Sequence, residues 1–218
     1  MPDYTVHKAA MELIPKFLQY SNLLIILDNP SVLCPFYWTE PDRVGISHGY
    51  DYLKHQGNII DLSQKCFDDM IRLLEDKISI RDPVMQKCIL YMNHYDVDML
   101  TFGQIAGAKY WGSGGDDQID RAGFFVWRKK DMFDQSNAYF LAANKMSDPI
   151  KIYKTCETLI ADTYLTYKKD VDKWKRSKYF NVYPVLAKHC ANMIQRAVAY
   201  GAMLTAMRIQ LAYKIVRG

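Results

Sequence analysis

The sequence has few cysteines, and none of them forms a recognisable pair. The five, Cys34, Cys66, Cys88, Cys156 and Cys190, are odd in number and show neither a CxxC nor a zinc-finger spacing. This pattern excludes a disulfide-rich scaffold. It favours reduced thiols that are buried as small apolar side chains.

Histidine motifs for metal binding are missing as well. None of the five histidines lies in an HExxH, ExxH or HxH sequence. His48 and His55 are seven residues apart, and His94 lies near two aspartates in NHYDVD. A lone histidine is more often hydrogen-bonded at the surface or in the core than bound to a metal. The sequence therefore predicts no metal site at histidine and no cofactor.

A long apolar run is absent too. The N-terminal residues include Asp3, His7 and Glu12, where a secretory signal would be apolar. The longest uncharged window near the C-terminus, Ala197–Met207, is far short of the roughly 18–20 apolar residues that span a bilayer. We therefore expect a soluble, intracellular or cytoplasmic protein, or one that resides within a virus particle.

Catalytic signatures are missing around the mid-chain glycines, which read GSGG at residues 112–115. They lack the Lys-Ser/Thr of a phosphate loop and the GxGxxG of a dinucleotide fold. Ser113 does not lie in a GxSxG elbow. Cys190 follows His189 on a predicted helix, where neighbouring side chains point about 100° apart and cannot easily pair. The glycines therefore indicate a flexible corner, and we expect no enzyme of these classes.

What the sequence does contain is helical periodicity. Half of its 218 residues are hydrophobic, which is enough for one sizeable core. Over residues 59–78 the apolar side chains recur at steps of three and four, which predicts an amphipathic helix. Asp-Pro pairs at 82–83 and 148–149, and Pro184, predict three further helix starts. The fold class predicted is mostly α, a helical bundle.

Irregular and bent segments interrupt this bundle. Residues 5–27 are predicted to be helical with a bend near Pro15. Gly201, within the last predicted helix, indicates a close helix crossing. The proline-rich loop over residues 28–57 is longer than the usual ceiling of about 12–15 residues, so we expect a surface arm or functional loop.

The charge of the chain divides at its middle. Residues 1–109 carry 10 Lys and Arg against 14 Asp and Glu, whereas residues 110–218 carry 18 against 10. We expect an acidic helical half over 1–111, a Gly/Asp corner over 112–120 and a basic helical half over 121–218, either as one compact domain or as two lobes. This asymmetry suits self-association or contact with an acidic polymer.

The stretch DDQID at residues 116–120 has the DDxxD spacing, which lets carboxylates on one helix face share Mg²⁺. It resembles the aspartate-rich motif of the all-α isoprenyl diphosphate synthases, which implies Mg²⁺ at Asp116, Asp117 and Asp120. No second acidic cluster repeats the motif, and the glycines before it favour a turn. We therefore favour the alternative, in which one of these aspartates caps a helix that begins near Ile119.

Basic residues interleaved with aromatics are the strongest functional signal. Cations neutralise phosphates, and aromatic rings give bases a stacking platform. Two segments have this character, 166–180 and 126–133. The nucleic-acid-binding residues predicted there are Arg128, Lys129, Lys130, Lys168, Lys169, Lys173, Trp174, Lys175, Arg176 and Lys178. The alternative is a solvated helix end, with Trp174 closing the core.

The function that these features favour is a non-enzymatic structural protein that associates with itself and contacts nucleic acid through its basic half. A viral or phage coat protein or nucleoprotein would fit. Residues 100–111, LTFGQIAGAKYW, somewhat resemble the short mid-domain helix of the helical coat proteins of flexible filamentous viruses. Two alternatives stay open: a connector that makes only protein contacts, with residues 28–45 as its docking loop, and a Mg²⁺-dependent enzyme that uses the DDxxD stretch.

Overall fold

The computed structural model describes residues 4–18, 41, 44–105, 149–175 and 183–218. Those residues form six helices and one short hairpin, so the predicted mostly α fold is confirmed. The helices are α1 (Tyr4–Leu18), α2 (Ile59–Glu75), α3 (Pro83–Asp98), α4 (Phe102–Ile105), α8 (Pro149–Lys175) and α9 (Tyr183–Arg217). The strands β1 (Tyr50–Asp51) and β2 (Gln56–Gly57) pair antiparallel, with Tyr50 opposite Gly57.

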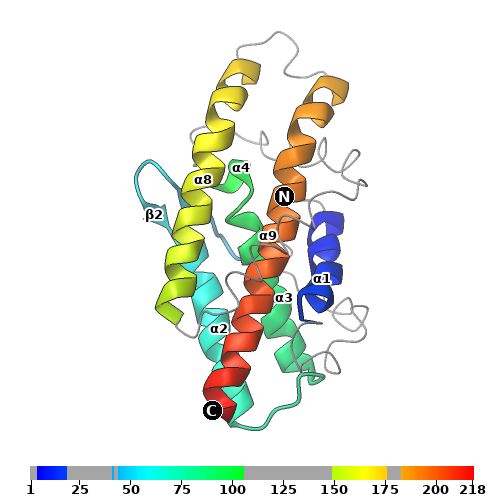
Figure 1. The fold of residues 1–218 in the computed structure, drawn as a ribbon, viewed down its shortest axis with the longest axis vertical. Helices are drawn as coiled ribbons and strands as arrows, with labels where there is room; N and C mark the ends of the chain where they lie inside the picture. Colours follow the sequence, from blue (N-terminus) through cyan, green and yellow to red (C-terminus); the bar gives the residue numbers. More distant parts are fainter. Residues whose placement is uncertain (1–3, 19–40, 42–43, 106–148, 176–182) are drawn as a thin grey trace.

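Helix α9 is the long element around which the others gather (Figure 1). Its C-terminal part packs against α1, α2 and α3, and α2 and α3 also pack against each other. Helix α8 runs antiparallel to α9, and the far ends of the two helices extend beyond the rest of the bundle (Figure 1). The buried core is therefore centred on α9 and also takes in one face of α8.

Local sequence explains where these helices begin. The periodic segment over 59–78 becomes α2, which buries Ile59, Phe67 and Met70. Helix α3 starts as predicted, because the Asp82 side chain accepts a hydrogen bond from the Val84 amide at 2.9 Å and a proline occupies the first position. Helix α8 starts at its predicted proline, and α9 starts one residue before its own.

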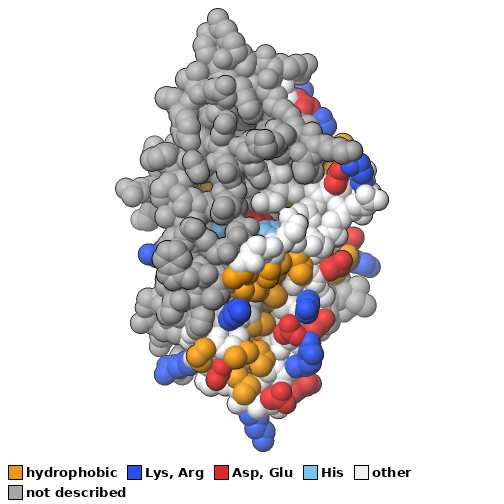
Figure 2. Space-filling model, turned by 180° about the vertical axis from the view of Figure 1, so that it is seen from behind, with side chains coloured by type: hydrophobic (Ala, Val, Ile, Leu, Met, Phe, Trp, Pro, Cys, Tyr) orange, Lys and Arg blue, Asp and Glu red, His pale blue; other side chains and the backbone are white. Residues whose placement is uncertain are grey.

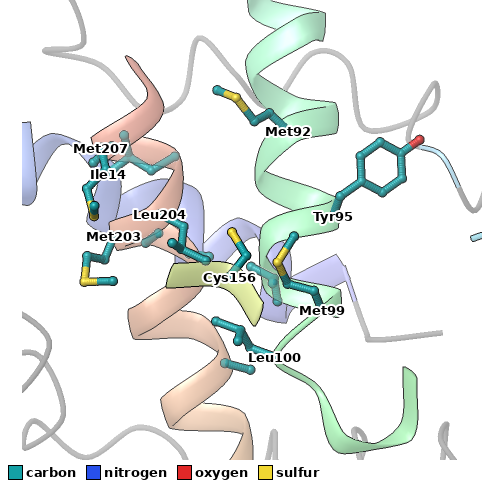
Figure 3. Close-up of a cluster of buried hydrophobic side chains, with 14 of the residues drawn as sticks. Ile14, Met92, Tyr95, Met99, Leu100, Cys156, Met203, Leu204 and Met207 are labelled. Atoms are coloured by element: carbon teal, nitrogen blue, oxygen red, sulfur yellow. The ribbon is translucent and has the colours of Figure 1, made fainter. Parts of the chain in front are cut away.

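Methionine fills much of the core between α3 and α9. Figure 3 shows Met92 on α3, Met99 directly after it, Met203 and Met207 on α9, and Cys156 of α8 among them. All five side chains are buried. Thioethers are flexible and fill irregular gaps, which suits a crossing of helices that differ in length and direction.

The crossing of α3 and α9 depends on Gly201, as the sequence predicted. A Cβ atom on Gly201 would lie 2.7 Å from Val97 Cγ2 and 2.8 Å from Val97 Cα. Only glycine therefore lets the two backbones approach this closely. This contact fixes which residues of α3 face α9.

Several predicted segments are described only in part. The predicted helix over 5–27 is confirmed as far as Leu18, with Pro15 inside α1. The proline-rich loop is described at residue 41 and from residue 44, where the backbone is irregular up to the hairpin. The Gly/Asp corner lies outside the described residues, and the division into halves stays a prediction.

Among the described helices, none is long and apolar enough to cross a membrane.

Candidate metal centre

Helix α3 is buried on all sides over its last two turns, and it carries polar residues there. Every residue from Met92 to Leu100 is buried. Because a helix turns by about 100° per residue, His94 and Asp98 share one face, whereas Asp96 lies on nearly the opposite face. The two faces hold two separate polar clusters.

The first cluster, which we call the His/Asp cluster, consists of His7, His48, His94 and Asp98. The His48 Nε2 atom lies 2.8 Å from Asp98 Oδ2, and the His94 Nε2 atom lies 3.2 Å from the same oxygen. The two Nε2 atoms are 3.1 Å apart. Three atoms that carry lone pairs therefore form a tight triangle.

His7 of α1 completes this cluster. Its Nε2 atom lies 3.5 Å from Asp98 Oδ1, and its ring stacks on that of His94 with centroids 4.2 Å apart. His7, His94 and Asp98 each offer a ligand atom within 4.8 Å of the others. The four side chains are between 0% and 3% exposed, so the cluster is closed to solvent.

Three segments that are distant in the sequence supply these four side chains. His7 comes from α1, His48 from the segment that precedes β1, and His94 and Asp98 from α3. The Asn58 side chain, just before α2, holds that segment: its Nδ2 group donates to the Ser47 carbonyl at 3.0 Å, and its Oδ1 atom accepts from the Gly49 amide at 3.2 Å. The cluster is thus a junction of the tertiary structure.

The electrostatics of Asp98 are unusual for its position. It is the last residue of α3, where the helix dipole disfavours a negative charge. Burial on its own raises the pKa of Asp98, but the attraction of His94 and the hydrogen bonds of His48 and His94 outweigh burial and hold that pKa far below its usual range. A charged carboxylate is therefore stable here only because positive charge is close to it.

His48 shows which atom meets that carboxylate. Its Nδ1 atom lies 2.9 Å from the Ile46 carbonyl oxygen, which can only accept, so Nδ1 carries a proton. A neutral His48 would then direct the bare lone pair of Nε2 at Asp98 Oδ2, 2.8 Å away. That contact is favourable only with a cation between the two atoms. Without a metal the cation is a second proton, and although burial lowers the pKa of His48, the bond to Asp98 raises it overall.

The geometry also suits a metal ion. Four ligands at about 2.0–2.1 Å in a tetrahedron are separated by edges of roughly 3.3–3.4 Å. His48 Nε2, His94 Nε2 and Asp98 Oδ2 lie 2.8–3.2 Å from one another, and His7 Nε2 lies 3.5 Å from Asp98 Oδ1. The ligand atoms of His7, His94 and Asp98 all lie within 4.8 Å of one another. The bond from His48 Nδ1 to a backbone carbonyl is the outer contact that orients histidine ligands and fixes their tautomer. His7, His94 and Asp98 are therefore close enough together to hold a metal ion, and His48 lies beside them.

The second cluster, on the opposite face of α3, is the Asp96 network. Asp96 accepts hydrogen bonds from Ser63 Oγ at 2.6 Å and from Thr205 Oγ1 at 2.9 Å. Arg208 of α9 is fully buried, with Nε 3.5 Å from Asp96 Oδ1 and with Nη1 donating to Gln64. This network has a fixed cation of its own.

The pKa shifts of Asp96 and Arg208 favour different protonation states of the pair. Burial raises the pKa of Asp96, which favours the neutral acid, and the Arg208 charge only partly offsets this. Burial lowers the pKa of Arg208, but attraction by Asp96 outweighs it, which favours the ion pair. Because a guanidinium stays protonated in proteins, we take Asp96 as a carboxylate paired with Arg208.

The predicted nucleic-acid interface is only partly described. Lys168 and Lys169 lie on α8, where Lys168 pairs with Asp172 at 2.5 Å and Lys169 is exposed. Lys173, Trp174 and Lys175 belong to the last turn of the same helix. Arg128, Lys129, Lys130, Arg176 and Lys178 lie outside the described residues, as do Asp116, Asp117 and Asp120. The interface and the Mg²⁺ alternative both stay predictions.

The residues of the His/Asp cluster carried one signal in the sequence. His94 and Asp98 are four residues apart, and on a helix this spacing places two ligands side by side. His7 and His48 offered no spacing signal, because each joins the cluster only through the packing of its segment against α3. A search for histidine pairs alone therefore missed them.

Comparisons with known proteins add no family to this geometry: no protein-family model, no curated protein and no solved structure matches the chain.

Proposed function

We propose that the chain is a metal-binding helical protein, and that the His/Asp cluster holds one divalent ion of the zinc type. The observation that carries the proposal is the convergence of three imidazole nitrogens on one buried carboxylate. Imidazole and carboxylate are ligands of Zn²⁺, and a tetrahedral set of them is typical of its sites.

The arrangement favours a structural role for this ion over a catalytic one. Catalytic zinc sites keep one position open to water or substrate, whereas structural sites take all four ligands from the protein. Here four side chains converge and all are buried. The ion would join α1 and the segment before β1 to α3, so its binding energy would contribute to folding.

This role agrees with the non-enzymatic structural protein predicted from the sequence. A metal that fixes α1 against the bundle would stabilise a building block without any turnover. Self-association and nucleic-acid contact stay predictions, and neither is needed for the metal proposal.

The proposal is tested by titrating Zn²⁺ into the metal-stripped chain in competition with a chromophoric chelator. We expect one ion per chain. His94→Ala removes a ligand and should weaken Zn²⁺ binding by about a hundred-fold or more, because the loss of a group that only supports a ligand already weakens metal affinity by about 10–100-fold. His55→Asn is the matched control, because His55 is an exposed histidine with φ of 51°, a conformation that asparagine tolerates.

Two results would contradict the proposal. One is binding that His94→Ala and His55→Asn weaken equally, because the ion would then lie elsewhere. The other is the lack of any Zn²⁺ uptake by the native chain while circular dichroism shows it folded.

A further inference from the structure

A separate pocket is formed near the C-terminal end of α9. It has a volume of about 650 Å³ and is formed by the end of α2, the connection to α3 and the last turns of α9. This volume falls within the range of about 300–1,000 Å³ that is typical of small-molecule sites. The His/Asp cluster contributes no residue to it.

All the charged side chains that line this pocket are positive. Its lining contains Lys77, Arg81 and Arg217 and no carboxylate. Among the residues that the structure describes, none of these three cations forms an ion pair, although other surface cations such as Lys54 and Arg196 do. Three unpaired cations around one hollow raise the local concentration of anions.

Part of the pocket lining is apolar. Ile80 and Tyr213 are 8% and 7% exposed, and Ile78 lies beside them. The guanidinium of Arg217 lies over the Tyr213 ring, 4.7 Å from its centroid, so this wall is both aromatic and cationic. On the rear face of the molecule, apolar side chains gather over the lower half, with both basic and acidic side chains among and beside them (Figure 2).

Lys77 occupies a backbone position that usually belongs to glycine. It follows the end of α2 with φ of 58°, its amide donates to Leu74, and the amide of Ile78 donates to Leu73 at 2.9 Å. This is a Schellman helix end, in which glycine is the common residue at the left-handed position. A lysine there is conformationally less favourable than glycine.

We propose that this pocket binds an amphiphilic anion, that is, a carboxylate or phosphate group attached to an apolar body. The three cations would hold the anionic group, and Ile78, Ile80 and Tyr213 would cover the apolar body. The combination is specific: a bare anion leaves the apolar part of the lining wet, and an uncharged hydrophobe leaves the cations without a partner.

The test uses the full chain and the fluorescent probe 8-anilinonaphthalene-1-sulfonate, which joins an anionic group to an apolar body. We expect saturable binding at one site per chain. Lys77→Gly and Arg81→Gln should each weaken it about ten-fold, because each removes one charge-assisted contact. Lys154→Gln, which removes an exposed charge outside the lining, should leave the affinity unchanged.

Lys77→Gly separates binding from folding. Glycine suits the left-handed position, so the melting temperature should stay equal or rise while the affinity for the probe falls. Equal binding by the native chain, Lys77→Gly and Arg81→Gln would overturn the proposal. So would equal binding of the uncharged analogue N-phenyl-1-naphthylamine.

Competition identifies the anionic group. Dodecanoate and dodecyl phosphate each join a twelve-carbon chain to one of the two candidate groups, and displacement of the probe by either supports the site and names the group. Failure of both to displace the probe would contradict the proposal. Displacement by inorganic phosphate at the same concentration as dodecyl phosphate would also contradict it, because the apolar part of the lining would then contribute nothing.

Discussion

Asp96 and Asp98 lie two residues apart on α3, and both are completely buried, yet their surroundings differ in kind. Asp96 meets two hydroxyl groups and the permanent charge of Arg208. Asp98 meets three histidines, whose charge depends on a proton or a metal ion. One carboxylate has a permanent counter-charge, and the other has a counter-charge only where a histidine is protonated or a metal ion is bound.

This difference indicates how one helix serves two roles. The Asp96 network joins α3 to α9 through protein atoms alone. If the His/Asp cluster holds the proposed ion, the attachment of α1 and of the segment around His48 would depend on that ion. Substitutions that disturb Asp96 and substitutions that disturb the His/Asp cluster should therefore differ in their effects on stability and on Zn²⁺ binding.

The largest expected effect comes from breaking the Asp96 network. Arg208→Met keeps much of the apolar volume but leaves Asp96 buried without its cation, which should cost about 3–5 kcal/mol of unfolding free energy. Urea denaturation measures this. If the two networks are separate, the variant should still bind one Zn²⁺ where it is folded, and a loss of binding under folding conditions would show that they are coupled.

Removing the metal should have the next largest effect. A ligand at a thousand times its Kd stabilises by about 4 kcal/mol, and at roughly 2–4 °C per kcal/mol for a chain of this size a chelator should lower the melting temperature by about 8–16 °C. Differential scanning fluorimetry with and without EDTA measures the shift. His94→Ala, which should bind Zn²⁺ about a hundred-fold more weakly, should show about a third of that shift or less, and an equal shift in that variant would place the ion elsewhere.

Gly201→Ala sharpens the comparison with a smaller effect. Its methyl group would meet Val97 at 2.7–2.8 Å and force α3 and α9 apart. Overpacking of this kind typically costs about 1–3 kcal/mol. The crossing of α3 and α9 places Asp96 beside Thr205, so the substitution should disturb the Asp96 network. We therefore expect a lower free energy of unfolding in urea and little change in Zn²⁺ affinity. A stability equal to the native value would show that the helices adjust without cost.

The smallest effect is expected at Cys156, whose Sγ atom accepts a hydrogen bond from Arg208 Nη2 at 3.3 Å. Burial raises the pKa of Cys156 to about 11, so the reactive thiolate is scarce at pH 8. In the folded chain, iodoacetamide should leave the Cys156 peptide unlabelled, as measured by mass spectrometry. Rapid labelling at pH 8 without unfolding would contradict this account of the Asp96 side of the core.

The sequence predicted the elements better than the sites, and the reason is physical. The period of α2, the Asp82 cap and the Gly201 crossing are local or depend on one small residue, so their patterns can be read along the chain. The His/Asp cluster is not local, because His7 and His94 are 87 residues apart in the numbering and meet only in the packed bundle. The spacing along α3 could indicate only His94 and Asp98, which are half of the proposed ligands.

X-ray absorption spectroscopy of the zinc-loaded chain tests the central claim most directly, because it reports the atoms bound to the metal. The account predicts four nitrogen and oxygen ligands at about 2.0–2.1 Å, the scattering signature of about three imidazoles, and no sulfur. Sulfur ligands at about 2.3 Å, or a shell of oxygen without imidazole, would place the ion outside the His/Asp cluster and contradict the account.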